Sequence, residues 1–215
     1  MSIEAVVALK ALSQSKRRLS AVLNDEQRSD LVEAMAQDVL SCLMRHPEID
    51  AVHVVCGEGW MRDVFPEGPL VVWQESESHE HGLIAAHEMV AVRTGAERLL
   101  FIHADLPFLG QEDISAVIAA SVDHHAVFSP DFTETGTNAV LRWRDQSVPL
   151  CFGEDSFARH QQAAKAAETR GGSCVPAVWR GMSTSQRIWI GWTPMTPSLG
   201  PPPHAGRRRL RPVYQ

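Results

Sequence analysis

The sequence lacks three features that would place the protein on a nucleic acid, in a membrane or in an oxidising compartment. Its 26 acidic residues outnumber its 20 basic residues, and the net charge of -6 disfavours a nucleic-acid backbone as main partner. No run of about 18 apolar residues predicts a membrane span, and the N-terminus lacks the basic region of a signal peptide. None of the four cysteines forms a C-x-x-C pair, which indicates reduced thiols and a cytoplasmic protein.

Sequence motifs of several enzyme classes are also missing. The chain contains no phosphate-binding loop G-x-x-x-x-G-K-S/T, no dinucleotide fingerprint G-x-G-x-x-G, no hydrolase motif G-x-S-x-G and no zinc motif H-E-x-x-H. Histidines do cluster, as His79 and His81 in one segment and as His124-His125 in another. An H-x-H pair can bind zinc, but we favour a polar surface here because no further motif supports a metal site.

What the sequence does contain is an alternation of apolar strands and amphipathic helices. The pair Asn24 and Gln27 has the spacing of a capping box and predicts the start of the first helix. We expect strands at 5–9, 52–57, 70–73, 99–105, 126–128 and 138–143, and helices at 24–46, 82–93, 112–120 and 156–170. This alternation predicts a doubly wound α/β sheet, for which 215 residues provide an adequate core.

The composition changes near residue 170, and we therefore expect a domain at 1–170 followed by an atypical segment at 171–215. That segment shows no clear hydrophobic period and includes a proline-rich stretch at 193–203 and a basic run at 207–211. Because such composition is typical of disordered tails, we expect the segment to be partly disordered. We interpret the basic run as solvated rather than as a docking site for an anionic partner.

The most informative segment is the apolar strand that ends on Asp105. Leu106-Pro107 follows and directs the chain out of the sheet, because proline has no N–H for a strand ladder. Ligands of α/β sheets lie at the carboxyl ends of strands, where a carboxylate can hold a hard cation that bridges phosphates. Asp105 is therefore a candidate metal ligand, and the alternative is an Asp that ends the strand in a solvated turn.

Two further kinds of segment suit phosphate groups. The stretch from Lys10 to Leu19 carries four cations, which suits a polyphosphate, with a solvated basic surface as the alternative. Glycine turns occur at 135–138 and 151–157, and Ser156 is the expected N-cap of the helix that follows. The N–H groups and dipole of a helix N-terminus favour an anion, with ordinary capping as the alternative.

These segments resemble, in order along the chain, motifs of the guanylyltransferases of coenzyme F-420 biosynthesis. The resembling segments are 6–10, 16–19, 104–107, 136–138 and 152–160, and the resemblance extends over about residues 4–170. It implies a single-domain, Rossmann-like nucleotidyltransferase sheet of the glycosyltransferase-A type with helices on both faces. It also implies transfer of GMP from GTP to 2-phospho-L-lactate, phosphoenolpyruvate or 3-phospho-D-glycerate, with release of pyrophosphate.

The same resemblance implies roles for individual residues. Asp105 and Lys16 would be catalytic, with Asp105 holding Mg²⁺; Lys10, Lys16 and Arg18 would bind GTP; and Thr137, Gly153 and Ser156 would bind the acceptor phosphate. The expected partners are GTP and a small phosphorylated carboxylate, without nucleic acid or membrane, and a homodimer is left open. A phosphate is already a nucleophile, so positioning, metal and cations would suffice without a general base.

The chain departs from the family pattern in two places. It has Gly82-Leu83-Ile84-Ala85 where the family has Gly-Leu-Asn-Ala, a difference that bears on nucleotide contact. It also has no acid after Glu168, whereas the family ends with acids that complete the metal site. Codons for 182–193, read from the third base of the Met182 codon, can encode Val-Asp-Val-Pro-Glu-Asp-Leu-Asp-Trp-Leu-Asp. We therefore hypothesise a shifted reading frame.

Two other functions remain open on the sequence. One is a different nucleotidyltransferase on the same sheet, such as a sugar-1-phosphate or molybdopterin type. The other is a degenerate nucleotide-binding protein, because the chain as written lacks the C-terminal metal acids. A test of GTP dependence distinguishes a guanylyltransferase from a different nucleotidyltransferase. A test of turnover distinguishes an enzyme from a degenerate nucleotide-binding protein.

Overall fold

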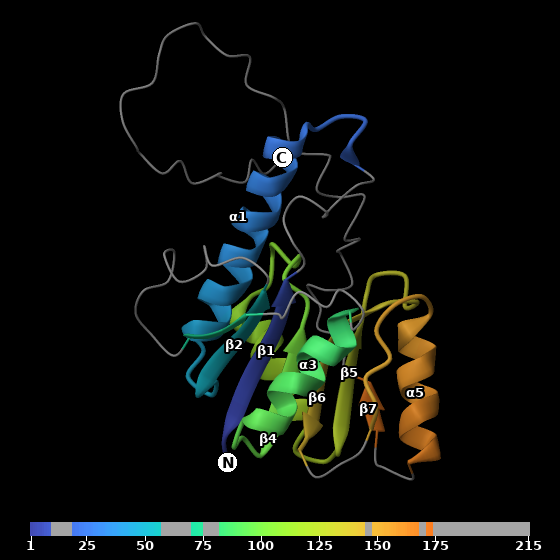
Figure 1. The fold of residues 1–215 in the computed structure, drawn as a ribbon. Coiled ribbons are helices and arrows are strands. Elements are labelled where there is room, and N and C mark those ends of the chain that lie inside the picture. The colour runs from blue at the N-terminus through green and yellow to red at the C-terminus, as the bar shows by residue number, and fades with distance from the viewer. Residues whose placement is uncertain (10–18, 57–69, 75–81, 145–147, 168–170, 174–215) are drawn as a thin grey trace, which may run out of the picture.

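A mixed sheet occupies the centre of the computed structural model, which describes residues 1–9, 19–56, 70–74, 82–144, 148–167 and 171–173 (Figure 1). Its strands in the described part of the chain are β1 (Ile3–Leu9), β2 (Ala51–Cys56), β3 (Leu70–Gln74), β4 (Arg98–Ile102), β5 (Ala126–Pro130), β6 (Thr137–Trp143) and β7 (Gly171–Ser173). They lie in the order β3-β2-β1-β4-β6-β5-β7. The expected α/β sheet is thus confirmed, and β7 extends it beyond residue 170.

The sheet is mixed rather than uniformly parallel, because one of its strands is reversed. β6 runs antiparallel to both of its neighbours, β4 and β5, while β1 pairs in parallel with β2 and β4. The physical reason is the short connection 131–136 between β5 and β6, because a parallel pair would need a crossover of a dozen or more residues. The reversal brings the first residues of β6 beside the last residues of β4 and β5.

The helices cover both faces of the sheet, as expected. They are α1 (Asp25–Met44), α3 (Gly82–Arg93), α4 (Gln111–Ala120) and α5 (Ser156–Ala166). α1 and α4 share one buried apolar cluster with Ile3, Ala5 and Val7 of β1, whereas α3 and α5 share the other with Val6. Successive strand residues point to opposite faces, so a strand covered on both faces is apolar throughout, which explains the continuous apolar run of β1.

The two helix starts predicted from sequence have different outcomes. The capping box is confirmed, since the Asn24 side chain accepts from the Gln27 N–H at 2.8 Å and the Gln27 side chain accepts from the Asn24 N–H at 3.0 Å. The prediction that Ser156 caps α5 is wrong: the N-cap is Asp155, in the left-handed conformation, and Ser156 is the first helical residue. The predicted end near residue 170 is also wrong, because α5 ends at Ala166 and the chain then enters β7 beside β5.

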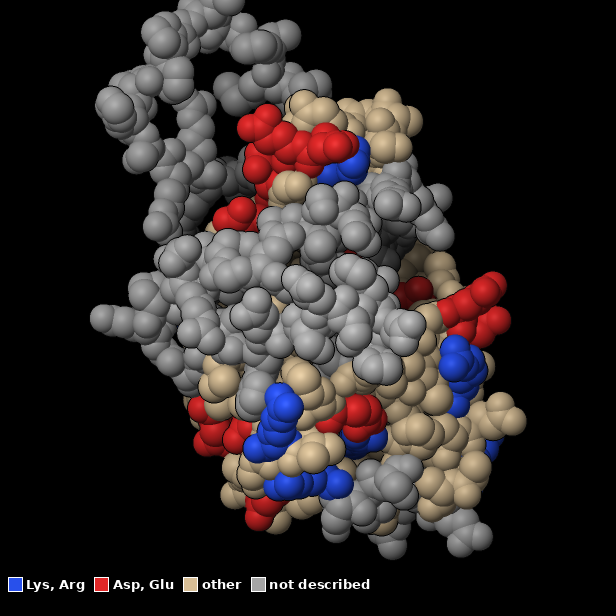
Figure 2. All heavy atoms as spheres, viewed as in Figure 1, with Lys and Arg blue, Asp and Glu red and all other residues tan. Residues whose placement is uncertain are grey.

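Acidic side chains gather over the N-terminal end of α1, whose first turn carries Asp25 and Glu26 (Figure 2). Negative charge at this end of a helix is stabilised by the helix dipole.

In the described part of the chain, no helix combines the length and the apolar character needed to cross a membrane.

Candidate functional site

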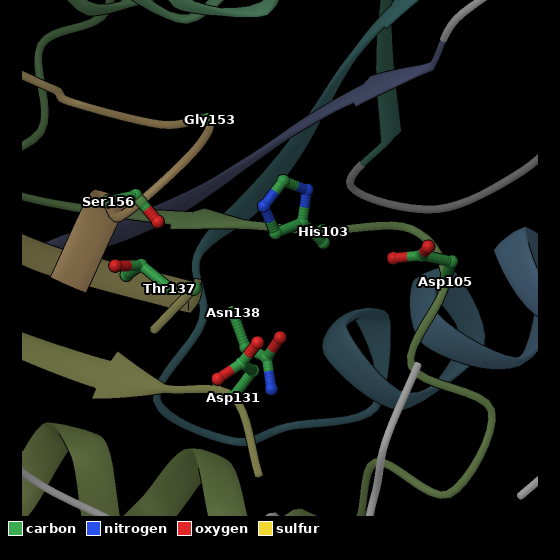
Figure 3. Close-up of a pocket in the computed structure, with 8 residues that line it drawn as sticks. His103, Asp105, Asp131, Thr137, Asn138, Gly153 and Ser156 are labelled. Carbon is green, nitrogen blue, oxygen red and sulfur yellow. The ribbon is translucent and has the colours of Figure 1, made fainter. Parts of the chain in front are cut away.

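A cavity of about 220 Å³ lies where the ends of β4, β5 and β6 meet the start of α5 (Figure 3). Its lining consists of polar side chains and glycines: His103, Asp105, Asp131, Gly136, Thr137, Asn138, Gly153 and Ser156. The antiparallel direction of β6 makes this arrangement possible, and the His103 N–H donates to the Asn138 carbonyl oxygen at 3.1 Å. Residues that are far apart in sequence therefore form one site at the ends of three neighbouring strands inside the sheet.

The cavity has a hydroxyl side and a carboxylate side. In Figure 3 the Ser156 and Thr137 hydroxyl groups lie on one side, and the half-buried Asp105 carboxylate points inward from the other. Asp105 lies three residues beyond the end of β4, since the strand ends at Ile102 and not at the carboxylate itself. Such a site can hold an anionic group and a cation next to each other.

The donor atoms of this cavity fit a Mg²⁺ ion that arrives with a nucleotide. No group of three or more His, Cys, Asp or Glu side chains suited to a metal occurs among the described residues. Two carboxylates, Asp105 and Asp131, nevertheless line the same cavity. Mg²⁺ commonly takes one or two carboxylates together with substrate phosphates and water, so the cavity fits a shared metal site better than an all-protein one.

Asp131 also organises the turn between β5 and β6. One of its carboxylate oxygens accepts from the Thr133 N–H at 3.1 Å, the Thr133 hydroxyl at 3.0 Å and the Thr135 N–H at 3.1 Å. A Cβ atom at Gly136 would lie 2.7 Å from the other oxygen, so this close approach requires glycine. The turn that leads into Thr137 is therefore held by side-chain contacts as well as by its backbone.

The second glycine turn has a different physical basis. Gly153 has φ +120, a conformation that residues with a Cβ rarely adopt, although the space beside it is open enough for a methyl group. The Phe157 N–H then donates to the Thr135 carbonyl oxygen at 3.0 Å, which ties the first turn of α5 to the β5–β6 turn. This contact brings the two predicted anion-binding segments together.

Ser156 is 2% exposed and lines the cavity at the first position of α5. Its hydroxyl is not used to cap the helix, because Asp155 occupies the N-cap position. N–H groups in the first turn of a helix have no acceptor within the helix, and the helix dipole adds partial positive charge there. The hydroxyl and this helix end together can bind an anionic oxygen.

Sequence reasoning assigned no role to His160, although it lies four residues after Ser156 and thus on the same face of α5. The fully buried imidazole ring lies with Nδ1 3.0 Å from the Thr137 hydroxyl oxygen and Nε2 2.8 Å from the Cys151 backbone nitrogen. It stacks on the Phe128 ring at 5.3 Å. Burial is the main cause that lowers the pKa of His160 to about 4, so the ring is neutral at pH 7.

Arg142 of β6 contacts the segment that leads to Cys151. The Arg142 guanidinium donates to the Val148 carbonyl oxygen and pairs with the Glu88 carboxylate of α3 at 2.8 Å. It also lies 5.1 Å from the Phe101 ring. These contacts link β6, α3 and the segment that leads from Val148 to Cys151.

The structure brings four of the predicted site residues to this cavity, namely Asp105, Thr137, Gly153 and Ser156. The predicted nucleotide-binding residues Lys10, Lys16 and Arg18 lie outside the described residues, as do His79, His81 and the segment 182–193. The sequence analysis did not single out two residues of this region, Asp131 in the cavity lining and His160 behind Thr137. For His160 a signal was present. Its helical spacing from Ser156 was the available signal, but its partner Thr137 is 23 residues away in the sequence.

Comparison with known proteins shows the family of this chain and the likeness of its fold. The family described as "Guanylyl transferase CofC like" matches residues 3–171. A phosphoenolpyruvate guanylyltransferase of Sphaerobacter thermophilus is 32% identical over 166 residues, which cover 77% of this chain and 80% of the relative. One of Rubrobacter xylanophilus is 36% identical over 168 residues, covering 76% and 80%.

A solved structure adds a likeness of fold. It is described as a nucleotide-diphospho-sugar transferase from Desulfovibrio desulfuricans G20 and has a TM-score of 0.66 at 18% identity, covering 81% of this chain and 80% of that one. This likeness is one of fold, and it agrees with the α/β sheet that the sequence predicts. Since the family match extends over most of the chain, the protein belongs to the CofC-like guanylyl transferase family.

Proposed function

We propose that the protein transfers GMP from GTP to a small phosphorylated carboxylate in coenzyme F-420 biosynthesis, with release of pyrophosphate. The observation that carries this proposal is the single cavity that joins the Asp105 carboxylate to Thr137, Gly153 and Ser156, in a chain of this family. The acceptors considered are phosphoenolpyruvate, 2-phospho-L-lactate and 3-phospho-D-glycerate. The names of the relatives favour phosphoenolpyruvate as the first to test.

In this proposal the hydroxyl side of the cavity binds the acceptor phosphate. Ser156 and Thr137 donate to its oxygens, and the glycine turn at Gly153 lets the backbone approach it. The bound phosphate already carries the attacking oxygen, so these residues need only hold it in line with the α-phosphorus of GTP. No side chain has to remove a proton.

The carboxylate side would serve the nucleotide. Asp105 would hold Mg²⁺, which when bound neutralises charge on the nucleotide phosphates. Lys10, Lys16 and Arg18 would lie along the triphosphate, and Lys16 would counter the charge that develops at the reacting phosphate. Arg and Lys are suited to this role because their cationic groups donate strong hydrogen bonds to phosphate.

A second candidate function is nucleotide binding without turnover. The observation that favours it is the absence of any acid after Glu168 in the sequence. With fewer carboxylates, Mg²⁺ would be held by fewer protein ligands and more water. A binding-only protein would retain GTP and release no pyrophosphate.

The test is product analysis after incubation with GTP, Mg²⁺ and each acceptor, comparing the natural protein with Asp105→Asn. This variant keeps the shape of the side chain and removes its charge, and we expect it to lower the rate by about 100-fold or more. The matched control is Asp123→Asn, which changes an exposed Asp outside the cavity. An unchanged rate in Asp105→Asn would rule out the metal role, and equal use of CTP would favour another nucleotidyltransferase.

A further inference from the structure

The hydrogen bonds of His160 determine which of its ring nitrogens carries a proton. The Cys151 backbone N–H can only donate, so the Nε2 atom 2.8 Å away must accept with its lone pair. A neutral imidazole has one protonated nitrogen, and that nitrogen is therefore Nδ1.

This tautomer determines what the Thr137 hydroxyl can do. Nδ1–H donates to the Thr137 oxygen at 3.0 Å, so the hydroxyl cannot donate its own proton to the ring. Among the described residues, we find no other hydrogen bond of this hydroxyl. Thr137 is 3% exposed and lines the cavity beside Ser156, so a cavity ligand is the available acceptor for its proton.

We propose that His160 is a positioning residue that makes Thr137 a fixed hydrogen-bond donor toward the anionic oxygens of the acceptor phosphate, an inference that rests on the function proposed above. The bonds run in one direction, from the Cys151 N–H through the imidazole to the hydroxyl and the ligand. Each donor in such a chain polarises the next. Phosphate and carboxylate oxygens accept such a bond, whereas an ammonium group cannot.

The surroundings of the ring favour its neutral form. Phe128 of β5 and Phe152 pack against it, at centroid distances of 5.3 Å in both cases. The charged or titratable groups that act on it are Arg159 of α5, Arg142 of β6 and His103, and all of them oppose a positive ring. A protonated Nε2 would moreover face the Cys151 N–H donor. Thr137 is therefore held by a neutral ring.

A pair of amide substitutions separates this role from simple packing. In His160→Asn, the side-chain N–H₂ can take the place of Nδ1 and still donate to Thr137. In His160→Gln, the amide reaches the place of Nε2 and can accept from Cys151, but nothing donates to Thr137. We expect His160→Gln to raise the acceptor KM about tenfold, with kcat and the KM for GTP changed less, and His160→Asn to stay closer to the natural protein.

Thr137→Val and a double variant complete the test. Thr137→Val keeps the shape and removes the hydroxyl, so adding His160→Gln to it should raise the acceptor KM no further. The matched control is Gln161→Asn at the exposed neighbouring position of α5. The proposal is overturned if His160→Gln and His160→Asn change the acceptor KM equally, or if His160→Gln has its full effect in the Thr137→Val background.

Two measurements that need no turnover complete the test, and the first uses the natural protein alone, so the proposal stays testable if a variant does not fold. ¹⁵N NMR of labelled histidine should show a neutral, Nδ1-protonated ring for His160 at pH 7, and an Nε2-protonated ring would overturn the inference. Calorimetry measures the affinity for phosphoenolpyruvate alone in the natural protein and the variants, and so tests the site without turnover. If the affinity falls more in His160→Gln than in His160→Asn but no GMP is transferred, the result contradicts the proposed function and supports the role of His160.

Discussion

At the scale of single residues, the Ser156 hydroxyl is placed to bind a ligand because Ser156 is the first helical residue and not the N-cap. Asp155 takes the N-cap position in the left-handed conformation and makes no side-chain cap bond. The buried Ser156 side chain faces the cavity together with Thr137. A buried hydroxyl on a cavity wall can contribute to ligand binding without contributing much to helix stability.

Ser156→Ala should therefore change binding more than stability. We expect the acceptor KM to rise about tenfold, as for the loss of one hydrogen bond to a charged group. The loss of an N-cap costs roughly 1 kcal/mol of stability, and the melting temperature should fall by less than this loss would cause. Steady-state kinetics and thermal unfolding measure the two effects, with Ser41→Ala on α1 as control. A large loss of stability with an unchanged acceptor KM would show that Ser156 stabilises the helix and does not bind the acceptor.

At the scale of elements, the β5–β6 turn positions the hydroxyl side of the site. The Asp131 carboxylate holds Thr133 and Thr135, and the Thr135 carbonyl accepts from the first turn of α5. Gly136 leaves room for the carboxylate at the point where β6 begins. The turn therefore transmits any displacement of Asp131 to both Thr137 and α5.

Gly136→Ala should disturb stability and acceptor binding together. The added methyl group would lie 2.7 Å from an Asp131 oxygen that has little freedom to move, at a cost of about 1–3 kcal/mol. Gly95→Ala is the matched control, because a Cβ there meets nothing within 4 Å. Urea unfolding and the acceptor KM should both change in Gly136→Ala only. Equal effects of the two substitutions would contradict the account of the turn.

The elements also show what the sequence could predict. Continuous apolar runs and the Asn24 capping box identified the strands and α1, because these signals are local. The direction of β6 and the Thr137–His160 contact depend on segments that meet only in the folded chain. The N-cap of α5 was misassigned because Asp and Ser are equally good capping residues by type, so residue type alone does not decide between Asp155 and Ser156.

At the scale of the whole molecule, the buried His87 links folding to pH. Its ring is fully buried between Phe101 and Phe152, and neither ring nitrogen has a hydrogen-bond partner among the described residues. Burial, followed by His103 and Arg142, lowers the pKa of His87 to about 3. Between pH 6.5 and 3 the unfolded chain therefore binds a proton at this residue that the folded chain does not.

The free energy of unfolding should accordingly fall as the pH decreases below 6.5. The contribution of His87 is about 1.4 kcal/mol per pH unit, or about 2 kcal/mol between pH 7 and pH 5. His87→Leu removes the titrating group, so its stability should depend less on pH by that amount. Urea unfolding of both proteins at the two pH values measures the difference. Parallel pH dependences would contradict the burial of a neutral ring.

The C-terminal segment concerns the whole molecule, because the family resemblance implies that acids in this segment complete the metal site, and this chain has no acid after Glu168. We expect the chain as written to bind GTP but to turn over slowly or not at all, and a chain carrying the shifted frame after about codon 171 to turn over faster with the restored acids. Sequencing the gene around this codon tests the hypothesis of a shifted frame. Assays of the two chains with GTP and phosphoenolpyruvate test whether the C-terminal acids matter for turnover. Equal and fast turnover by both chains would show that these acids are dispensable.

The measurement that tests the central claim most directly is ³¹P NMR of the reaction of both chains with GTP, Mg²⁺ and phosphoenolpyruvate. Attack by the acceptor phosphate on the α-phosphorus must join the two phosphorus atoms through one oxygen. We predict coupled resonances of a new diphosphate together with an equal amount of pyrophosphate, with the shifted-frame chain faster. Orthophosphate with GDP, or unchanged GTP with both chains under all three acceptors, would contradict guanylyl transfer by this protein.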